Sequence, residues 1–120
     1  FLYLPHSFFP MNMKEKFPLP NLLPAGFPDF PVPTREEAGL PEEAFVYVCF
    51  NKIMKVEPSI FTSWLRILQR TPNSVLWLLS SPIEAIPQVK EYASKYRVEN
   101  QIIFAPFVNT ADENYVRLRL

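Results

Sequence analysis

Three short apolar segments recur from residue 45 onward at nearly even spacing. They read FVYVCF at 45–50, VLWLL at 75–79 and QIIFA at 101–105, and their first residues lie 30 and 26 residues apart. Segments with a helical pattern of apolar residues follow the first two. A strand–helix–strand order with this period is typical of crossover units, in which neighbouring strands run parallel. The chain is therefore predicted to be an α/β protein with a parallel sheet.

The predicted helices are marked by start signals and by periodicity. Pro58 suits the first turn of a helix, where an amide hydrogen would have no partner. A second helical pattern covers residues 87–97, and residues 112–120 look like the start of a third helix, which Asp112 and Glu113 are predicted to cap. The apolar residues at helical spacing are Ile60, Phe61, Trp64, Leu65, Ile67, Leu68, Val89, Tyr92, Ala93 and Tyr96.

The predicted sheet defines an edge where a ligand could bind. Right-handed crossovers place the ends of all three strands, near Asn51, Ser80 and Pro106, at one edge. Because the strands are continuous apolar runs, we expect both of their faces to be covered, with Cys49, Trp64 and Trp77 in the core. Three strands make half of a doubly wound parallel sheet, so one side of the sheet is expected to lack a neighbouring strand.

The first 41 residues have a different composition. They contain nine of the 14 prolines and both glycines, which excludes a long helix or a central strand. We divide the chain into a Pro/Phe-rich extended linker segment, 1–41, and a partial sheet domain, 42–120. The linker is predicted to pack through its aromatic residues rather than to serve as an SH3-type ligand, the alternative for a Pro-rich tract. The candidate packing residues are Phe8, Phe9, Phe17, Phe27 and Phe30.

Charge and residue usage exclude several classes of function. Twelve basic residues balance twelve acidic ones, which argues against a general nucleic-acid binder. No apolar run approaches the roughly 18 residues that a membrane span needs. Cys49 is the single cysteine, so no internal disulfide is possible, and His6 is the single histidine, so a zinc site is not expected. The chain begins at Phe1 rather than Met, and we expect it to be a piece of a longer product.

Two lysines follow the first strand. Lys52 and Lys55 lie beyond its carboxyl end and just before the helix start at Pro58. A lysine is a compact cation suited to a phosphate oxygen, and a helix N-terminus also favours an anion. These residues leave two interpretations open, a site for a phosphate-bearing ligand and ordinary solvated loop lysines. No glycine-rich phosphate loop is present, and Ser80 and Ser81 lack the histidine partner that a nucleophilic serine needs.

The residues that surround these lysines resemble a known family. Residues 45–79, FVYVCFNKIMKVEPSIFTSWLRILQRTPNSVLWLL, are similar to part of the C-terminal catalytic lobe of the nucleocytoplasmic O-GlcNAc transferases. The family pattern there is a strand, F-N-x-x-x-K-[IM]-x-P, a helix with a central Trp, and R-x-P-N-S-x-L-W-L-L. The similarity continues through Tyr92-Ala93 and 101–104, and residues 4–9, LPHSFF, resemble the segment that precedes the lobe.

This resemblance implies a two-lobed glycosyltransferase of the GT-B type, in which residues 42–120 form part of the Rossmann-like, UDP-binding lobe. Such enzymes transfer N-acetylglucosamine from UDP-GlcNAc to Ser or Thr of intracellular proteins, with inversion and with neither a metal nor a cofactor. The implied partners are the donor, the protein acceptors, the remaining catalytic lobe and tetratricopeptide repeats. The implied location is the cytoplasm and nucleus, and the isolated fragment is expected to be inactive.

The resemblance also implies roles for individual residues. Lys55 matches the lysine that neutralises the UDP diphosphate, and it is the one expected catalytic residue. Lys52 stands where the family commonly has a Gln that makes a second phosphate contact. Leu79 and the backbone around Val108 are expected near the uracil and ribose.

Two positions depart from the family pattern. Ser80 replaces an Arg, and Tyr115 replaces a nucleotide-holding His in the simplest alignment. These departures motivate an alternative, a degenerate non-catalytic member that serves as an interaction module. A third possibility, a flavodoxin-like module for a small ligand, rests on strand order alone.

Overall fold

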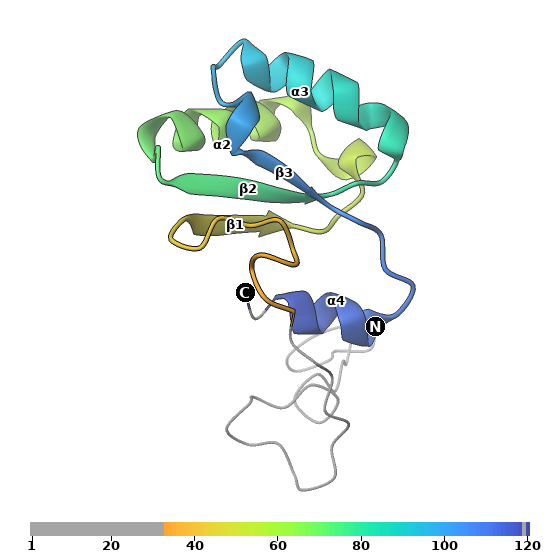
Figure 1. The fold of residues 1–120 in the computed structure, drawn as a ribbon. Helices are drawn as coiled ribbons and strands as arrows, with labels where there is room; N and C mark the ends of the chain where they lie inside the picture. The colour runs from red at the N-terminus through yellow and green to blue at the C-terminus, as the bar shows by residue number, and fades with distance from the viewer. Residues whose placement is uncertain (1–32, 119) are drawn as a thin grey trace, which may run out of the picture. The chain divides into compact units, whose positions relative to one another are not determined.

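The computed structural model describes residues 33–118 and 120, which belong to one compact unit. The five phenylalanines of the predicted linker and His6 lie outside the described residues. Strands and helices alternate along the unit, with single turns of 3-10 helix between them (Figure 1). The elements are β1 (Phe45–Cys49), η2 (Ile53–Lys55), α2 (Pro58–Arg70), β2 (Ser74–Leu79), η3 (Ile83–Ala85), α3 (Ile86–Ser94), η4 (Glu99–Gln101), β3 (Ile102–Ala105) and α4 (Ala111–Arg117).

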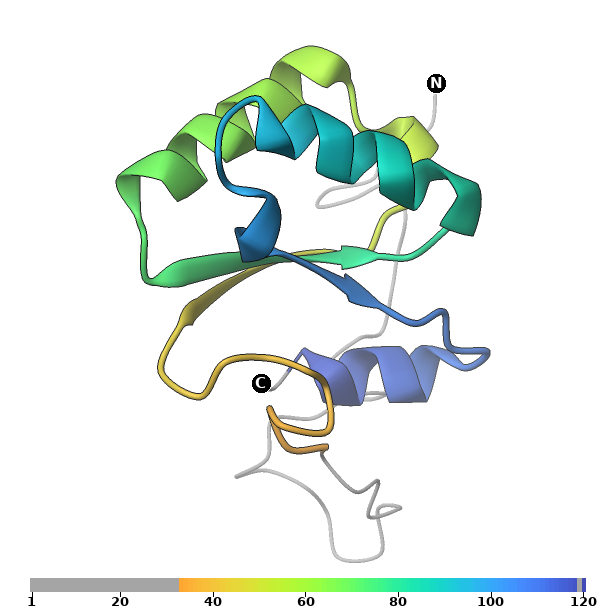
Figure 2. The ribbon, with the colours of Figure 1, turned by 45° about the horizontal axis from the view of Figure 1, so that its top comes forward.

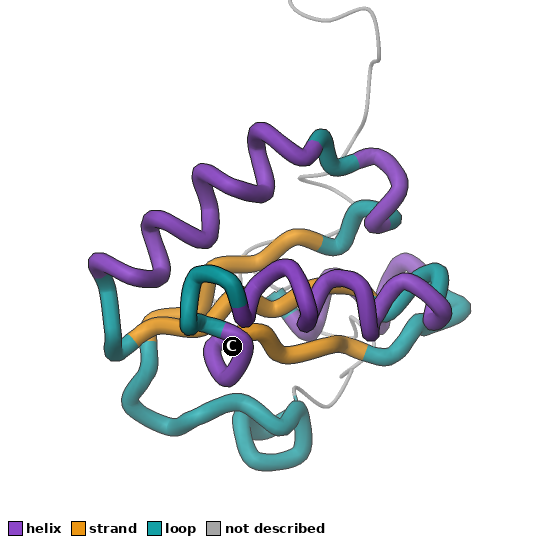
Figure 3. The backbone as a smooth tube through the Cα atoms, turned by 90° about the horizontal axis from the view of Figure 1, so that it is seen from above, coloured by secondary structure: helices purple, strands orange, loops and turns teal. Residues whose placement is uncertain are grey.

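The three strands form one parallel sheet in the order β1-β2-β3. This arrangement confirms the predicted α/β fold with crossover connections. Helices α2 and α3 cover one face of the sheet, and α4 lies on the opposite face (Figures 1 and 2). Seen from above, α2 and α3 run along the sheet next to one another (Figure 3). No helix within the described ranges is long and apolar enough to span a membrane.

The main core lies between the sheet and the two helices that cover it. Helix α2 begins with Pro58 at its first position and ends before Thr71, whose amide donates to the Leu68 carbonyl. Its apolar stripe places Leu65 and Leu68 against the sheet, and both are almost completely buried. The buried residues of this cluster are Leu65, Leu68, Leu76, Leu78, Val89, Ala93, Val98 and Ile102.

Two residues of α2 provide a matched test of this core. Leu65 has no exposed surface, whereas Ile67 is 44% exposed. We expect Leu65→Ala to lower the free energy of unfolding by about 2–5 kcal/mol, because the mutation leaves a cavity in a close-packed interior. Ile67→Ala is expected to cost much less, since its side chain buries less surface. Urea unfolding of both variants measures the difference, and equal losses would contradict the packing.

A second core lies on the α4 face of the sheet. Its buried residues are Leu40, Ala44, Val75, Trp77 and Ala105. Residues 33–44 therefore contribute to the folded unit through Leu40 and Ala44, although Leu40 falls in the predicted linker. Gly39 has φ +69° and ends the turn that precedes Leu40, a conformation that glycine adopts without strain. The division of the chain at residue 41 stays a prediction.

Strand β1 differs from its prediction. Its Phe45 and Val48 side chains are 63% and 41% exposed, and Cys49 is half-buried, so the strand is not covered on both faces. The reason is its position at the edge of the sheet, which an apolar sequence run alone does not reveal. By contrast, all six residues of the central strand β2 are buried, which confirms the prediction for 75–79 and adds Ser74 to the strand.

Three further expectations need correction. Trp64 is half-buried rather than a core residue, whereas Trp77 is buried as predicted. Ile60 and Ile67 are exposed, because the apolar pattern of α2 is wider than the stripe that the sheet covers. The N-terminus of α4 was predicted to be capped by Asp112 and Glu113, but the capping side chain is that of Thr110. Its hydroxyl oxygen accepts the Glu113 amide hydrogen (3.2 Å).

Candidate functional site

The carboxyl ends of the three strands meet at one edge of the sheet. The register pairs Cys49 with Leu78 and Leu79 with Ala105, so the strands end almost level with one another. Two backbone hydrogen bonds connect the loops beyond this edge. They run from the Ile53 amide to the Ser81 carbonyl (3.0 Å) and from the Ser80 amide to the Ala105 carbonyl (2.9 Å). In open α/β sheets, ligands bind at this edge.

The loop after β1 holds both predicted lysines close together. Lys52 is the residue before the 3-10 turn η2 and Lys55 is its last residue. The Lys55 amide donates to the Lys52 carbonyl (2.9 Å), which fixes the two residues in one tight turn. Both side chains are exposed. A lysine carries its charge on a flexible stem, so both ammonium groups are accessible to an anion beyond the end of β1.

The start of α2 follows the lysines directly. The first helical hydrogen bond runs from the Phe61 amide to the Glu57 carbonyl (2.9 Å), and Pro58 has no amide hydrogen. The amides of Ser59 and Ile60 are thus the free donors of the first turn. No acidic residue lies in that turn, and the Glu57 side chain makes no capping hydrogen bond. The helix terminus adds a partial positive charge next to the lysine pair.

The other two predicted residues lie at the same edge of the sheet, but they differ in accessibility. Leu79 is 7% exposed at the end of β2, and its carbonyl accepts the Ser81 amide hydrogen (2.9 Å). Val108 is half-buried in the loop that follows β3. Because the Leu79 side chain is buried, a ligand at this strand end would contact mainly backbone groups.

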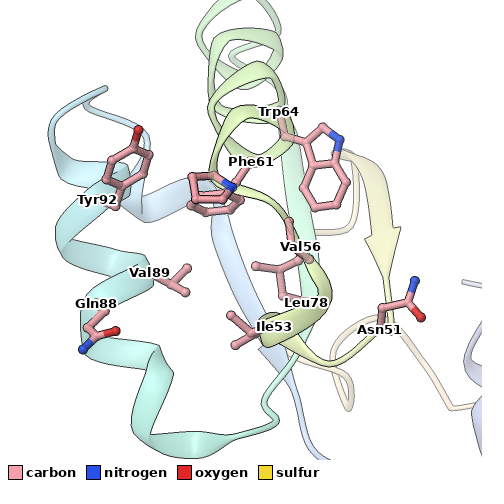
Figure 4. Close-up of a pocket in the computed structure, with 10 residues that line it drawn as sticks. Asn51, Ile53, Val56, Phe61, Trp64, Leu78, Gln88, Val89 and Tyr92 are labelled. Carbon is pink, nitrogen blue, oxygen red and sulfur yellow. The ribbon is translucent and has the colours of Figure 1, made fainter.

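A pocket of about 300 Å³ lies behind the lysine loop, between α2 and α3 (Figure 4). Sequence reasoning placed Phe61, Trp64 and Tyr92 on the apolar faces of helices and did not predict an opening there. Neither lysine lines it, but Asn51, Ile53 and Val56 of the lysine loop do, so the pocket adjoins the cationic edge. The Tyr92 hydroxyl at its rim hydrogen-bonds with Thr62 Oγ1 (2.8 Å), which lowers the pKa of Tyr92. The lining residues are Asn51, Ile53, Val56, Pro58, Phe61, Trp64, Leu78, Gln88, Val89 and Tyr92.

The sequence analysis also did not single out Arg117, which is buried on the α4 face of the sheet. The Arg117 guanidinium lies 4.6 Å from the ring centre of Phe50 and 5.8 Å from that of Trp77. It donates to the Pro106 carbonyl and to Asn114 Oδ1, both at 2.8 Å. Burial lowers the pKa of Arg117, and the nearby Glu113 partly offsets this effect. Arg117 thus fixes the loop after β3, which carries Val108, against the end of β1.

The described part of the chain contains no group of three or more His, Cys, Asp or Glu side chains placed to hold a metal ion. The positive charge at the strand-end site comes from the two lysines and the N-terminus of α2, and the exposed carboxylate of Glu57 lies between them in the sequence.

The parallel α/β sheet, with two exposed lysines beyond its carboxyl edge, belongs to the class of open α/β folds that bind ligands at this edge. The chain belongs to glycosyl transferase family 41, whose family model matches residues 26–120. The chain is 38% identical over 104 residues to the probable UDP-N-acetylglucosamine–peptide N-acetylglucosaminyltransferase SEC of Arabidopsis thaliana, a match that covers 86% of this chain and 10% of that protein.

A second relative is the UDP-N-acetylglucosamine–peptide N-acetylglucosaminyltransferase of Caenorhabditis elegans. It is 32% identical over 85 residues, which cover 70% of this chain and 7% of the relative. The chain thus spans a tenth or less of the length of both relatives.

Proposed function

We propose that this chain forms part of the donor-binding lobe of an enzyme that transfers N-acetylglucosamine from UDP-GlcNAc to Ser or Thr hydroxyls of proteins. Family membership and the activities named for both relatives support the reaction class. The observation that carries the proposal is the exposed lysine pair, Lys52 and Lys55, at the carboxyl end of β1. Two cations at a strand end suit the diphosphate of a UDP-sugar.

Lys55 has the central role in the proposed chemistry. When the bond between the sugar and the diphosphate breaks, negative charge grows on the leaving UDP. A cation fixed next to that oxygen stabilises the transition state more than the ground state, which raises the rate. Lys52, held in the same turn, makes a second contact with the diphosphate. The two lysines supply the positive charge, and no metal or cofactor is part of the proposed mechanism.

The remaining proposed contacts with the donor come from the end of β2 and from the loop after β3. The end of β2 at Leu79 and the backbone around Val108 would support the uracil and ribose. We further propose inversion at the sugar carbon, a location in the cytoplasm and nucleus, and cooperation with a second catalytic lobe and tetratricopeptide repeats. These points are supported by the resemblance of residues 45–79 to the family pattern.

The isolated 120-residue chain is expected to show no glycosyltransferase activity. A two-lobed enzyme binds its donor between the lobes, and this chain supplies only one wall of that site. Incubation with UDP-GlcNAc carrying a radiolabelled sugar and an acceptor protein measures transfer directly, with the full-length gene product as the positive control. Label transferred by the isolated chain would contradict the expectation.

Titration of the full-length gene product with UDP tests the proposed function. Saturable binding that UDP-GlcNAc competes away supports a donor site. The departures at Ser80 and Tyr115 favour the alternative of a non-catalytic interaction module. A folded full-length product that binds neither UDP nor UDP-GlcNAc would decide for that alternative.

A further inference from the structure

The pocket between α2 and α3 is not used in the proposed function. Its volume of about 300 Å³ lies at the lower end of the range for small-molecule pockets. The rings of Phe61, Trp64 and Tyr92 line it, and Leu78 lines it from the sheet (Figure 4). The sugar and ribose of UDP-GlcNAc carry hydroxyl groups, which would lose hydrogen bonds to water in an apolar pocket. The pocket therefore suits a different ligand, one with an apolar body.

The turn that carries the two lysines forms one wall of this pocket. Ile53 and Val56 line the pocket, and Figure 4 shows Ile53 facing Val89 of α3. The Lys55 amide donates to the Lys52 carbonyl (2.9 Å). The Val56 amide donates in the same way to the Ile53 carbonyl (3.0 Å). In such a 3-10 turn, residues three positions apart lie on the same side. The lysine pair therefore occupies the side of the turn next to the one that lines the pocket.

The lysines give the pocket a cationic rim. Lys52 and Lys55 are exposed and do not line the pocket, so their ammonium groups lie outside its apolar space. The exposed carboxylate of Glu57 is the acidic group nearest to them in the sequence, and two cations next to one carboxylate leave a net positive charge. A lysine ammonium group suits a phosphate oxygen. The rim therefore favours an apolar ligand that also carries a phosphate group.

We propose that this pocket binds a small aromatic phosphate monoester, with its rings between α2 and α3 and its phosphate at Lys52 and Lys55. The aromatic lining favours an aromatic body, because ring pairs in offset or edge-to-face contact add to the free energy of burial. The phosphate would occupy the positive charge that the donor diphosphate uses, so the ligand would compete with UDP-GlcNAc. This competition rests on the proposed function. The binding itself does not, since the lining and the rim of the pocket are independent of the reaction.

Isothermal titration of the full-length gene product with naphthyl phosphate tests the pocket. Inorganic phosphate and naphthol are the matched probes, because each carries one half of the ligand. Naphthyl phosphate is expected to bind about tenfold or more tighter than either probe, since ring burial and charge pairing both contribute. If inorganic phosphate binds as tightly as naphthyl phosphate, the rings add nothing and the proposal is overturned. Naphthol that binds as tightly would remove the role of the lysines, with the same consequence.

Variants of the full-length gene product locate the ligand. Val89 lines the pocket and is 8% exposed, so Val89→Phe fills the space and should weaken naphthyl phosphate binding about tenfold or more. Ile67→Phe adds a ring at an exposed position of α2 outside this pocket and should leave binding unchanged. Lys52→Ala should weaken binding of naphthyl phosphate but not of naphthol.

Circular dichroism checks that the pocket variant folds. If Val89→Phe does not fold, Gln88→Trp replaces it, because Gln88 is an exposed residue of the pocket lining and tolerates a larger side chain. Unchanged naphthyl phosphate binding in a folded pocket variant would overturn the proposal.

UDP titration of the same preparation reports the proposed function independently. Naphthyl phosphate binding that Val89→Phe weakens supports the pocket even if UDP does not bind, whereas UDP binding without saturable naphthyl phosphate binding removes the pocket ligand and keeps the donor site. If both bind and naphthyl phosphate does not displace UDP, its phosphate lies away from the lysines and the proposal is overturned. Phosphatidic acid in phosphatidylcholine vesicles is the lipid probe. Binding to these vesicles without binding of naphthyl phosphate would assign the rim to a membrane surface and overturn the proposal.

Discussion

Lys55→Ala is expected to lower kcat of the full-length gene product for sugar transfer by about 100-fold or more. The loss of one fixed contact to developing charge in a transition state costs on the order of 3 kcal/mol. The effect should fall mainly on kcat, because the charge on the leaving diphosphate is larger in the transition state than in bound UDP-GlcNAc. Affinity for UDP, the product with that charge fully developed, should fall as well. Initial rates over a range of UDP-GlcNAc concentrations and a UDP titration measure both effects.

Three variants are controls for this prediction. Lys55→Arg keeps the charge but changes its shape, so it should restore part of the activity. Lys52→Ala should have a smaller effect, since Lys52 is proposed to make the second contact. Lys95 is an exposed lysine at the C-terminal end of α3, and Lys95→Ala should leave kcat unchanged. Full activity of Lys55→Ala, or equal losses in all three alanine variants, would remove Lys55 from the mechanism.

The sequence predicted the order and type of the elements because local patterns carry that information. The apolar run before Asn51 and the helical spacing after Pro58 depend on near neighbours, so they needed no knowledge of tertiary structure. The exposure of β1 could not be predicted in this way. Its residues are as apolar as those of the buried strand β2, but within the described sheet β1 has one neighbouring strand and β2 has two.

The candidate site was predictable to a similar extent. Lys52 and Lys55 could be placed because residues that follow parallel strands share one edge of the sheet. Arg117 could not, because its contacts with Phe50 and Trp77 join segments that are far apart in the sequence. The pocket beside Tyr92 was missed for the same reason, since packing between α2 and α3 leaves it open.

Trp77→Ala is expected to have the largest effect on stability. The Trp77 side chain is 1% exposed, and its ring meets that of Phe50 edge to face with 4.9 Å between the ring centres. Truncating a buried tryptophan costs about 3–5 kcal/mol, a large share of the 5–15 kcal/mol that stabilises a typical domain. Arg117 would also lose an aromatic surface on which its buried charge rests. Urea unfolding followed by circular dichroism measures the loss.

The second tryptophan is the matched control. Trp64 is half-buried on α2 and lines two open pockets, so Trp64→Ala removes fewer contacts and should cost clearly less. Trp77→Phe should also cost less than Trp77→Ala, because a ring remains and the substitution removes a buried indole N–H that has no partner among the described residues. If Trp64→Ala destabilises the chain as strongly as Trp77→Ala, the α4-face core contributes less than its burial indicates. In that case the contacts between the sheet and α2 would dominate the stability of the unit.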